Sequence, residues 1–529
     1  MGESDVDPET DLAVAERLLD EGDAVAALRH AKRAQERIAK ALTPQPLWLG
    51  MLAGRLIDCG GDLHRADLVR EGLTILESEY ELLATVIERF SLQYNIGNAK
   101  KSLHDLEAAQ RREFNPASIV LLTEAKDHYW QALQLADERE PQLLVNLANA
   151  LDQCCRAAEA LRYYDEALAL RPGFPMAHLN RGEALLLLNR LSGTFTVSQL
   201  AEAKRSFRLA ETSQIPPHLR SAAREKRLFV SHRLEELGWS DERSSAYDEQ
   251  HRLEASEHDA YWQFCLDHYL ALSEHSLYCR CVGARRDDLT IPKPTGPIAG
   301  EFVPRLELLL NRVKSEFCLA RALYYQGIQP VAGWAAPEFE GTFSELHEKE
   351  AIGLAPEFLR TSFRLCFGVL DKLALGLSEL YGLAEADEPL PFESFWRPRD
   401  QRQKGEPRWT KLNQQHNWGL VALYSIATDL NSKKGQWGFF KKHRNSLEHG
   451  LLVLLERGAQ DVPAIARPER VTLETLPMAT FRAHTLHMLQ LTASAIFSFV
   501  FCVREEGLRA LSSTPGLQVT VDKKDVGKE

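Results

Sequence analysis

The chain has 529 residues, of which 44% are apolar and 26% carry a charge, the balance of a soluble globular protein. This length exceeds what one hydrophobic core organises, so two to four domains are expected. The formal net charge of −12 excludes a protein whose whole surface coats nucleic acid, but it is compatible with a local basic site. The acidic start predicts no secretory signal, and with nine cysteines this favours reduced thiols and a cytoplasmic location.

The first 240 residues are predicted to form an array of helical repeats. Between residues 11 and 237 alanine and leucine are abundant and strand-like runs are rare. The clearest unit, 141–172, follows the tetratricopeptide pattern of two helices, and its final proline ends the second helix because proline cannot continue one. Its pattern residues are Leu144, Leu147, Ala148, Leu151, Ala160, Tyr164, Ala167 and Pro172.

Neighbouring segments repeat this spacing. The triplet Ala160, Tyr164 and Ala167 recurs as Ala125, Tyr129, Ala132 and as Ala203, Phe207, Ala210. The sequence NIGNA at 95–99 returns as NLANA at 146–150. Repeat arrays of this kind expose a concave groove. The repeated asparagines are expected either to contact a ligand there or to form hydrogen bonds between helices.

Residues 241–350 are expected to connect the array to a C-terminal domain. A long helix is predicted over 304–327, where apolar residues recur at three- and four-residue intervals. Four metal-ligating side chains lie close together before it, namely His268, His275, Cys279 and Cys281. Their spacing fits no standard zinc finger, so buried thiols with helix-surface histidines are the favoured interpretation and no metal site is predicted.

Four strongly helical segments between residues 351 and 515 are predicted to form a bundle with a shared core. They are 356–383, 414–430, 439–456 and 477–511. The last includes the apolar run 493–503, which is shorter than the ~20 residues of a membrane span, so we expect a buried core helix. The proline-rich, charged loop 384–408 is expected on the surface near the functional site.

A polar cluster lies in the third of these segments. The stretch 441–450 reads KKHRNSLEHG, and the apolar run 451–455 follows it at once, so one helix is predicted to carry both. Asn445 and His449 are four residues apart and share a helix face, and the long side chain of Arg444 can reach the same side. The cluster combines a phosphate-binding guanidinium, an amide and an imidazole suited to proton transfer at neutral pH.

Asp371 is an ionisable residue inside the apolar stretch 370–374 of the first segment. A buried charge requires a partner, and Arg444 or Lys442 is a candidate. Alternatively, Asp371 and its neighbour Lys372 face solvent while the apolar residues face the core.

The spacing R-N-x-x-x-H resembles the signature of the HEPN ribonuclease superfamily. Roughly from residue 261 to 511, the chain resembles a bacterial HEPN family whose members carry helical repeats ahead of a helical bundle. Similar residues outside the motif are Trp262, Cys265, Leu266, 311–327, 370–372, 392–396, Asn417, Leu423, Tyr424, Asp429 and Leu430. The expected fold is all-α, a tetratricopeptide-like solenoid followed by a HEPN four-helix bundle. The expected domains are the array 1–240, a helical connection 241–350, the HEPN domain 351–515 and a disordered tail 516–529.

The resemblance implies a metal-independent endoribonuclease without a cofactor. In this chemistry the ribose 2′-hydroxyl attacks the adjacent phosphorus, which leaves a 2′,3′-cyclic phosphate and a free 5′-hydroxyl, so DNA is not a substrate. The implied catalytic residues are Arg444, Asn445 and His449, the RNA-binding residues are Lys441, Lys442 and His443, and the supporting residues are Asp371 and Glu448.

The resemblance also implies partners. A single HEPN motif supplies half of the usual composite site, so a homodimer is expected, with RNA as substrate and no membrane. The array is expected to hold a peptide or protein trigger in its groove, which fits a role in anti-phage defence or a toxin-like abortive response. The alternative is a non-catalytic scaffold that binds nucleotides or proteins.

Overall fold

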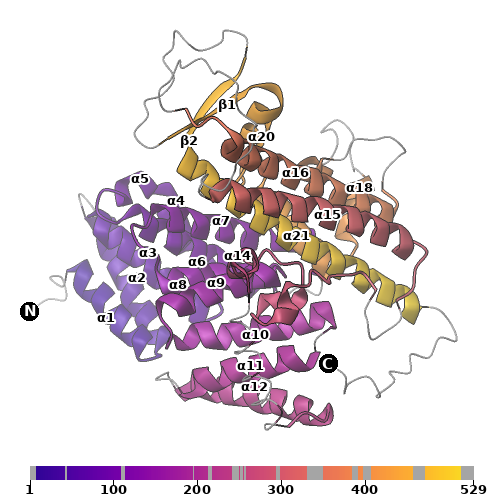
Figure 1. Ribbon diagram of the computed structural model, residues 1–529. Helices are drawn as coiled ribbons and strands as arrows, with labels where there is room; N and C mark the ends of the chain where they lie inside the picture. Colours follow the sequence, from indigo (N-terminus) through magenta and orange to yellow (C-terminus); the bar gives the residue numbers. More distant parts are fainter. Residues whose placement is uncertain are drawn as a thin grey trace, which may run out of the picture. The chain divides into compact units, whose positions relative to one another are not determined.

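The computed structural model describes residues 7–41, 45–108, 114–194, 196–212, 217–240, 258–292, 298–329, 350–383, 391–396, 407–456 and 471–513, together with Arg243, Gln250 and Glu254 (Figure 1). The chain divides into two compact units, one of residues 1–154 with 163–177, the other of residues 155–162 with 178–529. Helices dominate both units, which confirms the predicted all-α class. The expected tail 516–529 lies outside the described residues.

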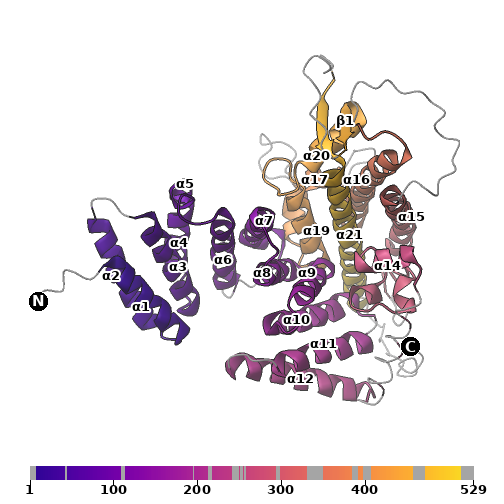
Figure 2. The same ribbon diagram turned by 60° about the vertical axis from the view of Figure 1, so that its left-hand side comes forward.

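The first unit consists of consecutive helices that pack in pairs, as predicted for the repeat array (Figure 2). Its helices are α1 (Pro8–Asp20), α2 (Ala24–Lys40), α3 (Pro46–Asp62), α4 (Ala66–Ser78), α5 (Tyr80–Leu83), α6 (Arg89–Ala108), the 3-10 helix η1 (Pro116–Ile119), α7 (Val120–Leu135) and α8 (Pro141–Gln153). Helix α9 (Ala157–Leu170) begins in the second unit and contributes residues 163–170 to the first.

Small residues allow the paired helices to approach closely. A Cβ atom on Gly97 of α6 would lie 2.7 Å from the ring of Tyr129 on α7, so only glycine fits. A Cβ atom on Gly182 would likewise lie 2.5 Å from the ring of Phe207 in the next pair. Ala148 holds the matching position of the unit 141–172 and is fully buried. The small and aromatic positions of the sequence pattern therefore do pack as the repeat predicts.

The second unit continues with helices and two 3-10 turns before its long bundle. These elements are α10 (Pro175–Ser192, in this unit from residue 178), α11 (Thr196–Thr212), α12 (Pro217–Glu236), α14 (Ala260–Asp267), η3 (Glu274–Leu277) and η4 (Val282–Arg285). The division between the units thus falls within α9 and α10, whereas the domain boundary was expected at residue 240.

Four long helices form the bundle, as predicted, but one member differs from the prediction. They are α15 (Val303–Ile328), α16 (Leu354–Tyr381), α19 (Trp418–Asp429) and α21 (Met478–Ser512). Helix α15, expected in the connecting region, packs along α16 and α21. Helix α21 lies centrally: its composition would suit a membrane span, but 83% of its most apolar window is buried, as in the core helix of a soluble bundle. The helix predicted over 439–456 as the third member of the bundle is shorter than expected and lies at one end of the bundle.

The prediction of one helix over 439–456 is wrong. The chain forms helix α20 (Phe440–His449) and then strand β1 (Leu451–Leu455), which pairs in parallel with β2 (Leu473–Pro477). Gly450 ends the helix with an extended backbone (φ −140°, ψ −150°), and a Cβ atom there would lie 2.5 Å from the carbonyl oxygen of Thr472. The leucines then alternate, Leu451 exposed and Leu452 buried, which is the period of a strand.

Part of the expected surface loop 384–408 is buried. Residues 391–396 contain the short helix α17 (Phe392–Phe395), and Phe392 is only 2% exposed. Helix α18 (Pro407–Asn413) begins at the end of this stretch. The segments of the loop between residues 384 and 390 and between 397 and 406 lie outside the described residues.

Two buried arginines attach the irregular segment 268–292 to the bundle. On α15, Arg321 binds both carboxylate oxygens of Asp287 at 3.0 and 2.7 Å and donates to the carbonyl oxygen of Leu270. On α21, Arg504 forms an ion pair with Glu274 and donates to the backbone carbonyl of Ile291. These charge-assisted contacts satisfy backbone groups that no regular element covers.

Candidate active site and repeat groove

A tight turn places α20 at the end of α19. The backbone N–H of Trp437 donates to the carbonyl oxygen of Asp429 at 2.9 Å, and the indole of Trp437 lies 4.0 Å from the ring of His487 on α21. A Cβ atom on Gly438 would lie 2.2 Å from the carbonyl oxygen of Asn431. The turn is therefore closed by backbone contacts that only glycine permits at this position.

A buried ion cluster fixes the same end of α19. Arg156, which directly precedes α9, has no exposed surface and donates to Asp429 Oδ2 at 2.6 Å. Its other guanidinium nitrogens bind both carboxylate oxygens of Glu159 at 2.7 and 2.8 Å. The guanidinium thus ties the start of α9 to the residue from which the turn toward α20 begins.

Helix α20 has one buried and one exposed face. Phe440, His443 and Ser446, three residues apart, are 0%, 3% and 1% exposed. Asn445 and His449 are exposed on the opposite side. The structure therefore presents the predicted amide and imidazole to solvent, as their spacing requires.

Arg444 lies between these faces and contacts helix α16. Its Nη2 atom is 3.6 Å from Oδ2 of Asp371, and its guanidinium lies 5.4 Å from the centre of the Phe367 ring. Of the two partners considered for Asp371, the structure shows Arg444. The second carboxylate oxygen of Asp371 accepts from the backbone N–H of Phe392 at 2.8 Å. Burial raises the pKa of Asp371, although this N–H and Arg444 act in the opposite direction.

The lysines of α20 differ in accessibility. Lys441 is half-buried and its Nζ lies 2.7 Å from a carboxylate oxygen of Glu393. The Lys442 side chain is 66% exposed and lies 3.5 Å from Glu474. Lys433 and Lys434, in the turn before α20, are also exposed. Exposed ammonium groups therefore lie both before α20 and on it. Glu448 is exposed on α20, and the structure gives no further support for the role expected of it.

His443 was expected to contact RNA, but its side chain is buried and contacts other parts of the protein. Its Nδ1 lies 2.9 Å from Oε1 of Glu474 on β2, and its Nε2 lies 3.2 Å from Nδ1 of His484 on α21. Ser446 donates to the second oxygen of Glu474 at 2.9 Å. The histidine therefore joins α20 to the sheet and to α21 and holds the exposed face in place.

The environment shifts the protonation of this buried group. Burial lowers the pKa of His484 to about 4, and the neighbouring His443 acts in the same direction. Burial alone would raise the pKa of Glu474, but the hydrogen bonds from His443 and Ser446 outweigh it, so the pKa lies below its ordinary value. Glu474 therefore remains an acceptor for α20 at neutral pH.

Sequence reasoning missed Glu474, His484 and Glu393 as positioning residues. The available signal was the stretch VTLETLP at 471–477, whose valine and threonines favour a strand. Had that strand been recognised, its single carboxylate would have been a candidate partner for the histidine of the motif.

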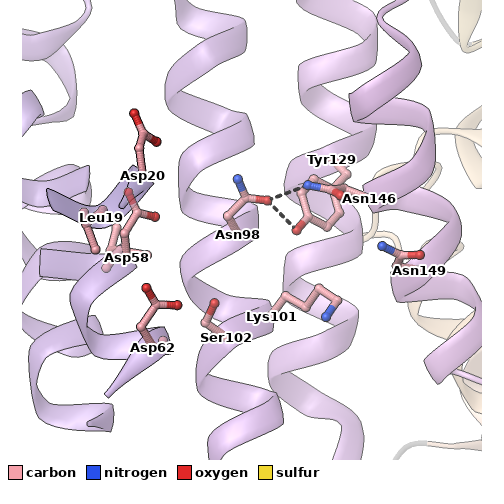
Figure 3. Close-up of a pocket in the computed structure, with 12 residues that line it drawn as sticks. Leu19, Asp20, Asp58, Asp62, Asn98, Lys101, Ser102, Tyr129, Asn146 and Asn149 are labelled. Atoms are coloured by element: carbon pink, nitrogen blue, oxygen red, sulfur yellow. Dashed lines mark hydrogen bonds between the residues drawn. The ribbon is translucent and has the colours of Figure 1, made fainter. Parts of the chain in front are cut away.

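The first unit contains a groove of about 490 Å³ that repeated asparagines line (Figure 3). Asn98 on α6 accepts hydrogen bonds from the Tyr129 hydroxyl at 2.8 Å and from the Asn146 amide at 3.0 Å. Asn149 on α8 accepts from the hydroxyl of Tyr164 on α9 at 2.7 Å. The expected hydrogen bonds between helices are confirmed, and the asparagines also line the groove, whereas their contact with a ligand stays a prediction.

The two walls of the groove carry different charges. Asp20 lies at the end of α1, while Asp58 and Asp62 are one turn apart on α3 (Figure 3). Lys101 and the asparagines form the facing wall, which comes from α6 and α8. An extended ligand with a cationic part would meet carboxylates on one side and hydrogen-bonding amides on the other.

Comparison with known proteins extends the assignment beyond the short motif. Residues 299–506 match the family model of LA2681-like HEPN domains, whereas the chain matches no curated protein. The match includes α15, which the predicted boundary at residue 351 had left outside the domain, and it contains every residue of the candidate active site. HEPN domains are generally ribonucleases, so the match supports ribonuclease or nucleotide-binding function in broad terms. Residues 299–506, within the C-terminal unit of this chain, are therefore similar to the HEPN domains of the LA2681-like family.

Proposed function

We propose that this chain is a metal-independent endoribonuclease that works as a homodimer under the control of its repeat array. The observation that carries the proposal is the exposed face of α20 within the HEPN match. It presents His449 and Asn445 to solvent beside a guanidinium that Asp371 holds at 3.6 Å. A guanidinium, an amide and an imidazole on one short helix are the groups that phosphate binding and proton transfer need.

In the proposed reaction His449 removes the proton from the ribose 2′-hydroxyl, and the oxygen attacks the adjacent phosphorus. The bond from phosphorus to the 5′-oxygen breaks, and the leaving oxygen takes a proton from a second imidazolium. The products are a 2′,3′-cyclic phosphate and a 5′-hydroxyl. Arg444 stabilises the negative charge that grows on the non-bridging oxygens, and Asn445 donates a hydrogen bond to the phosphate.

The requirement for an acid and a base supports a homodimer. One chain offers one such histidine on α20, whereas the reaction uses one imidazole to accept a proton and another to donate one. Two copies related by a two-fold axis would each contribute Arg444 and His449 to a shared site. His449 is exposed and Arg444 is one-third exposed, so both side chains are accessible to a second copy.

The test is cleavage of total RNA by the purified full chain without added metal, with mapping of the product ends. We expect 2′,3′-cyclic phosphate ends, and no cleavage of DNA. The His449→Ala variant should lose about 10²–10⁴-fold in rate and Arg444→Ala about 10²–10³-fold. The matched controls are His232→Ala and Arg233→Ala, whose side chains are exposed on α12 in the same unit.

Unchanged cleavage in both site variants would reject the proposed catalytic residues. RNA or nucleotide binding without any cleavage by the wild type would instead favour the non-catalytic scaffold.

The groove supports a controlling role for the first unit. An active ribonuclease harms its own cell, so the proposed function in phage defence or as a toxin requires a restraint or a trigger. The carboxylates of Asp20, Asp58 and Asp62 favour a peptide with basic side chains, and the facing asparagines offer hydrogen bonds to its backbone.

Helix α9 has residues in both compact units. Tyr164, on the part of α9 that belongs to the first unit, donates to Asn149 in the groove. Arg156, which directly precedes α9, binds Asp429 at the turn that positions α20. A ligand that moves α9 would therefore act on both of these hydrogen bonds.

Charge reversal tests the role of the groove. The double variant Asp58→Lys, Asp62→Lys should bind a fluorescent lysine-rich peptide more weakly than the wild type, and the peptide should no longer change the rate of RNA cleavage. Glu36→Lys, an exposed substitution on α2 outside the groove, is the control. Equal peptide binding by the double variant and the control would exclude the groove as the trigger site.

A further inference from the structure

We propose that His275, Cys279 and Cys281 form a zinc-binding site in the irregular segment between α14 and α15. The sequence pattern favoured scattered thiols and no metal, but the structure brings three of the four candidate ligands together. The ligand atoms of these residues all lie within 4.8 Å of one another. This site is separate from the proposed active site, and no step of the proposed ribonuclease reaction uses it.

The distances approach those of a tetrahedral zinc site. His275 Nε2 lies 3.2 Å from Cys281 Sγ. In tetrahedral zinc sites, bond lengths of about 2.3 Å to sulfur and about 2.0 Å to nitrogen place neighbouring ligand atoms roughly 3.5–3.8 Å apart. A separation of a few tenths of an ångström would therefore admit the ion between the imidazole and the thiolate. Thiolate and imidazole ligands together favour zinc over magnesium or calcium, which prefer oxygen.

A neighbouring hydroxyl orients the imidazole for this role. His275 Nδ1 lies 2.8 Å from the hydroxyl of Tyr278, which in turn lies 2.6 Å from the hydroxyl of Ser198 on α11. A histidine that ligates zinc through one nitrogen usually hydrogen-bonds through the other, which fixes its tautomer and ring position. Here this arrangement directs Nε2 toward the sulfur of Cys281.

The backbone around the cysteines also suits a metal site. The N–H of Cys281 points to Cys279 Sγ at 3.4 Å, and an N–H donor of this kind stabilises a thiolate. The guanidinium of Arg280 donates to the carbonyl oxygens of Ser276 and Cys279 at 2.6 and 3.2 Å and so closes the turn that carries the ligands.

A metal ion would link parts of a segment that has little regular structure. Between α14 and α15 the described residues form only two 3-10 turns, and the apolar cluster beneath them consists of Leu266, Ala271, Cys281 and Ala284. Small irregular regions of this kind are commonly held by a disulfide or a structural metal. His275 and Cys281 are buried, whereas Cys279 is only partly covered, so an ion can enter from its side.

The test is direct metal analysis of the full chain, purified with reductant and without an affinity tag. After reconstitution with zinc and removal of the excess, we expect one zinc ion per chain. Cobalt should replace it and give the thiolate-to-cobalt absorption in the near ultraviolet. Cys279→Ser and Cys281→Ser should each lose the bound metal, whereas Cys318→Ser, a partly exposed thiol on α15, should retain it.

Three results would overturn the proposal. The first is a reconstituted wild type without stoichiometric zinc. The second is a cobalt-loaded wild type that lacks the thiolate-to-cobalt absorption. This measurement uses the wild type alone, so it does not depend on whether any variant folds. The third concerns the chelated protein: Cys279 and Cys281 resist alkylation there until reductant is added. That result would show that the two cysteines form a disulfide and do not bind a metal.

Discussion

Arg444 owes its position to a carboxylate on another helix. Asp371 sits on α16, accepts a backbone hydrogen bond from Phe392 and faces the guanidinium at 3.6 Å. The pair is one-third exposed on both sides, so its net contribution to stability is at most about 1 kcal/mol. Its importance would lie in aiming the guanidinium at the phosphate.

The Asp371→Asn variant tests this positioning. Asparagine still accepts from the Phe392 N–H but loses the charge, so we expect RNA cleavage to fall about 10- to 100-fold through kcat with little change in the unfolding temperature. Asp267→Asn, an exposed carboxylate on α14, is the control. If cleavage falls only as far as a lower unfolding temperature explains, Asp371 stabilises the fold and does not position Arg444 for the reaction.

The group formed by the buried His443 and Glu474 and the half-buried His484 is expected to make the stability of the second unit depend on pH. The pKa of His484 is about 4 in the folded chain and about 6.5 in the unfolded chain, so the unfolded state takes up a proton first as the pH falls. The depressed pKa of Glu474 adds a further loss below pH 4.5.

We therefore expect the free energy of unfolding to decrease between about pH 6.5 and pH 4 by on the order of 1–3 kcal/mol. Urea titrations across this range measure it. His484→Gln should flatten the decrease, whereas His232→Gln on exposed α12 should leave it in place. An equal pH dependence in wild type and His484→Gln would show that another group is responsible.

At the scale of single residues, the sequence predicted part of the candidate active site. Spacing alone placed Asn445 and His449 on one face, because four residues complete about one helical turn. It did not reveal that His443 turns inward, although Phe440, His443 and Ser446 recur at three-residue steps. The partner Glu474 lies on a strand that the sequence pattern did not predict, so the buried role of the histidine was hidden.

The turn between α19 and α20 determines where helix α20 begins. Gly435 and Gly438 both lie against backbone carbonyl oxygens, at 2.3 and 2.2 Å from the position of a Cβ atom. A side chain at either position would push the turn away from α19 and tilt the exposed face of α20.

We expect Gly438→Ala to lower the free energy of unfolding by about 1–3 kcal/mol and to reduce RNA cleavage further than this loss explains. The control is Gly368→Ala in the interior of α16, where the nearest atom to the new Cβ is Lys372 Nζ at 3.9 Å. That variant should gain about 0.5–1 kcal/mol because alanine favours a helix. Chemical unfolding followed by circular dichroism compares the two, and equal stability would contradict the role of the turn.

Helices were easier to predict from the sequence than strands. The long periodic faces of α16 and α21 were recognised within a few residues, and α15 was recognised as a helix but not as a member of the bundle. The run 451–455 contains four leucines and one valine, which suit a helix or a strand equally. The close approach of Gly450 to Thr472 decides the outcome, and that contact depends on a partner strand distant in sequence.

For the whole molecule, the proposed homodimer makes a quantitative prediction. If each reaction needs His449 from both chains, a mixed dimer of wild type and His449→Ala is inactive. After unfolding and refolding of mixtures, activity should follow the square of the wild-type fraction, so an equal mixture retains about one quarter of it. A linear dependence would show that each chain cleaves RNA on its own.

Domain boundaries were the least predictable feature at this scale. The repeat pattern and the HEPN motif indicated the two functional parts, but α9 and α10 contribute residues to both compact units. Local spacing cannot show such sharing, because it arises from contacts such as that of Arg156 with Asp429, which are 273 residues apart.

Zinc bound by His275, Cys279 and Cys281 would change how the effect of a chelator on RNA cleavage by this protein is interpreted. Arg321 and Arg504 attach the segment that carries the cluster to α15 and α21, so removal of zinc would loosen the support of two bundle helices without touching the reaction. Inhibition by EDTA would then indicate a metal-dependent fold, and it would not contradict the proposed metal-independent reaction. Cleavage by Cys281→Ser with and without EDTA separates the two cases: if the variant no longer responds to EDTA, the chelator acts on the fold.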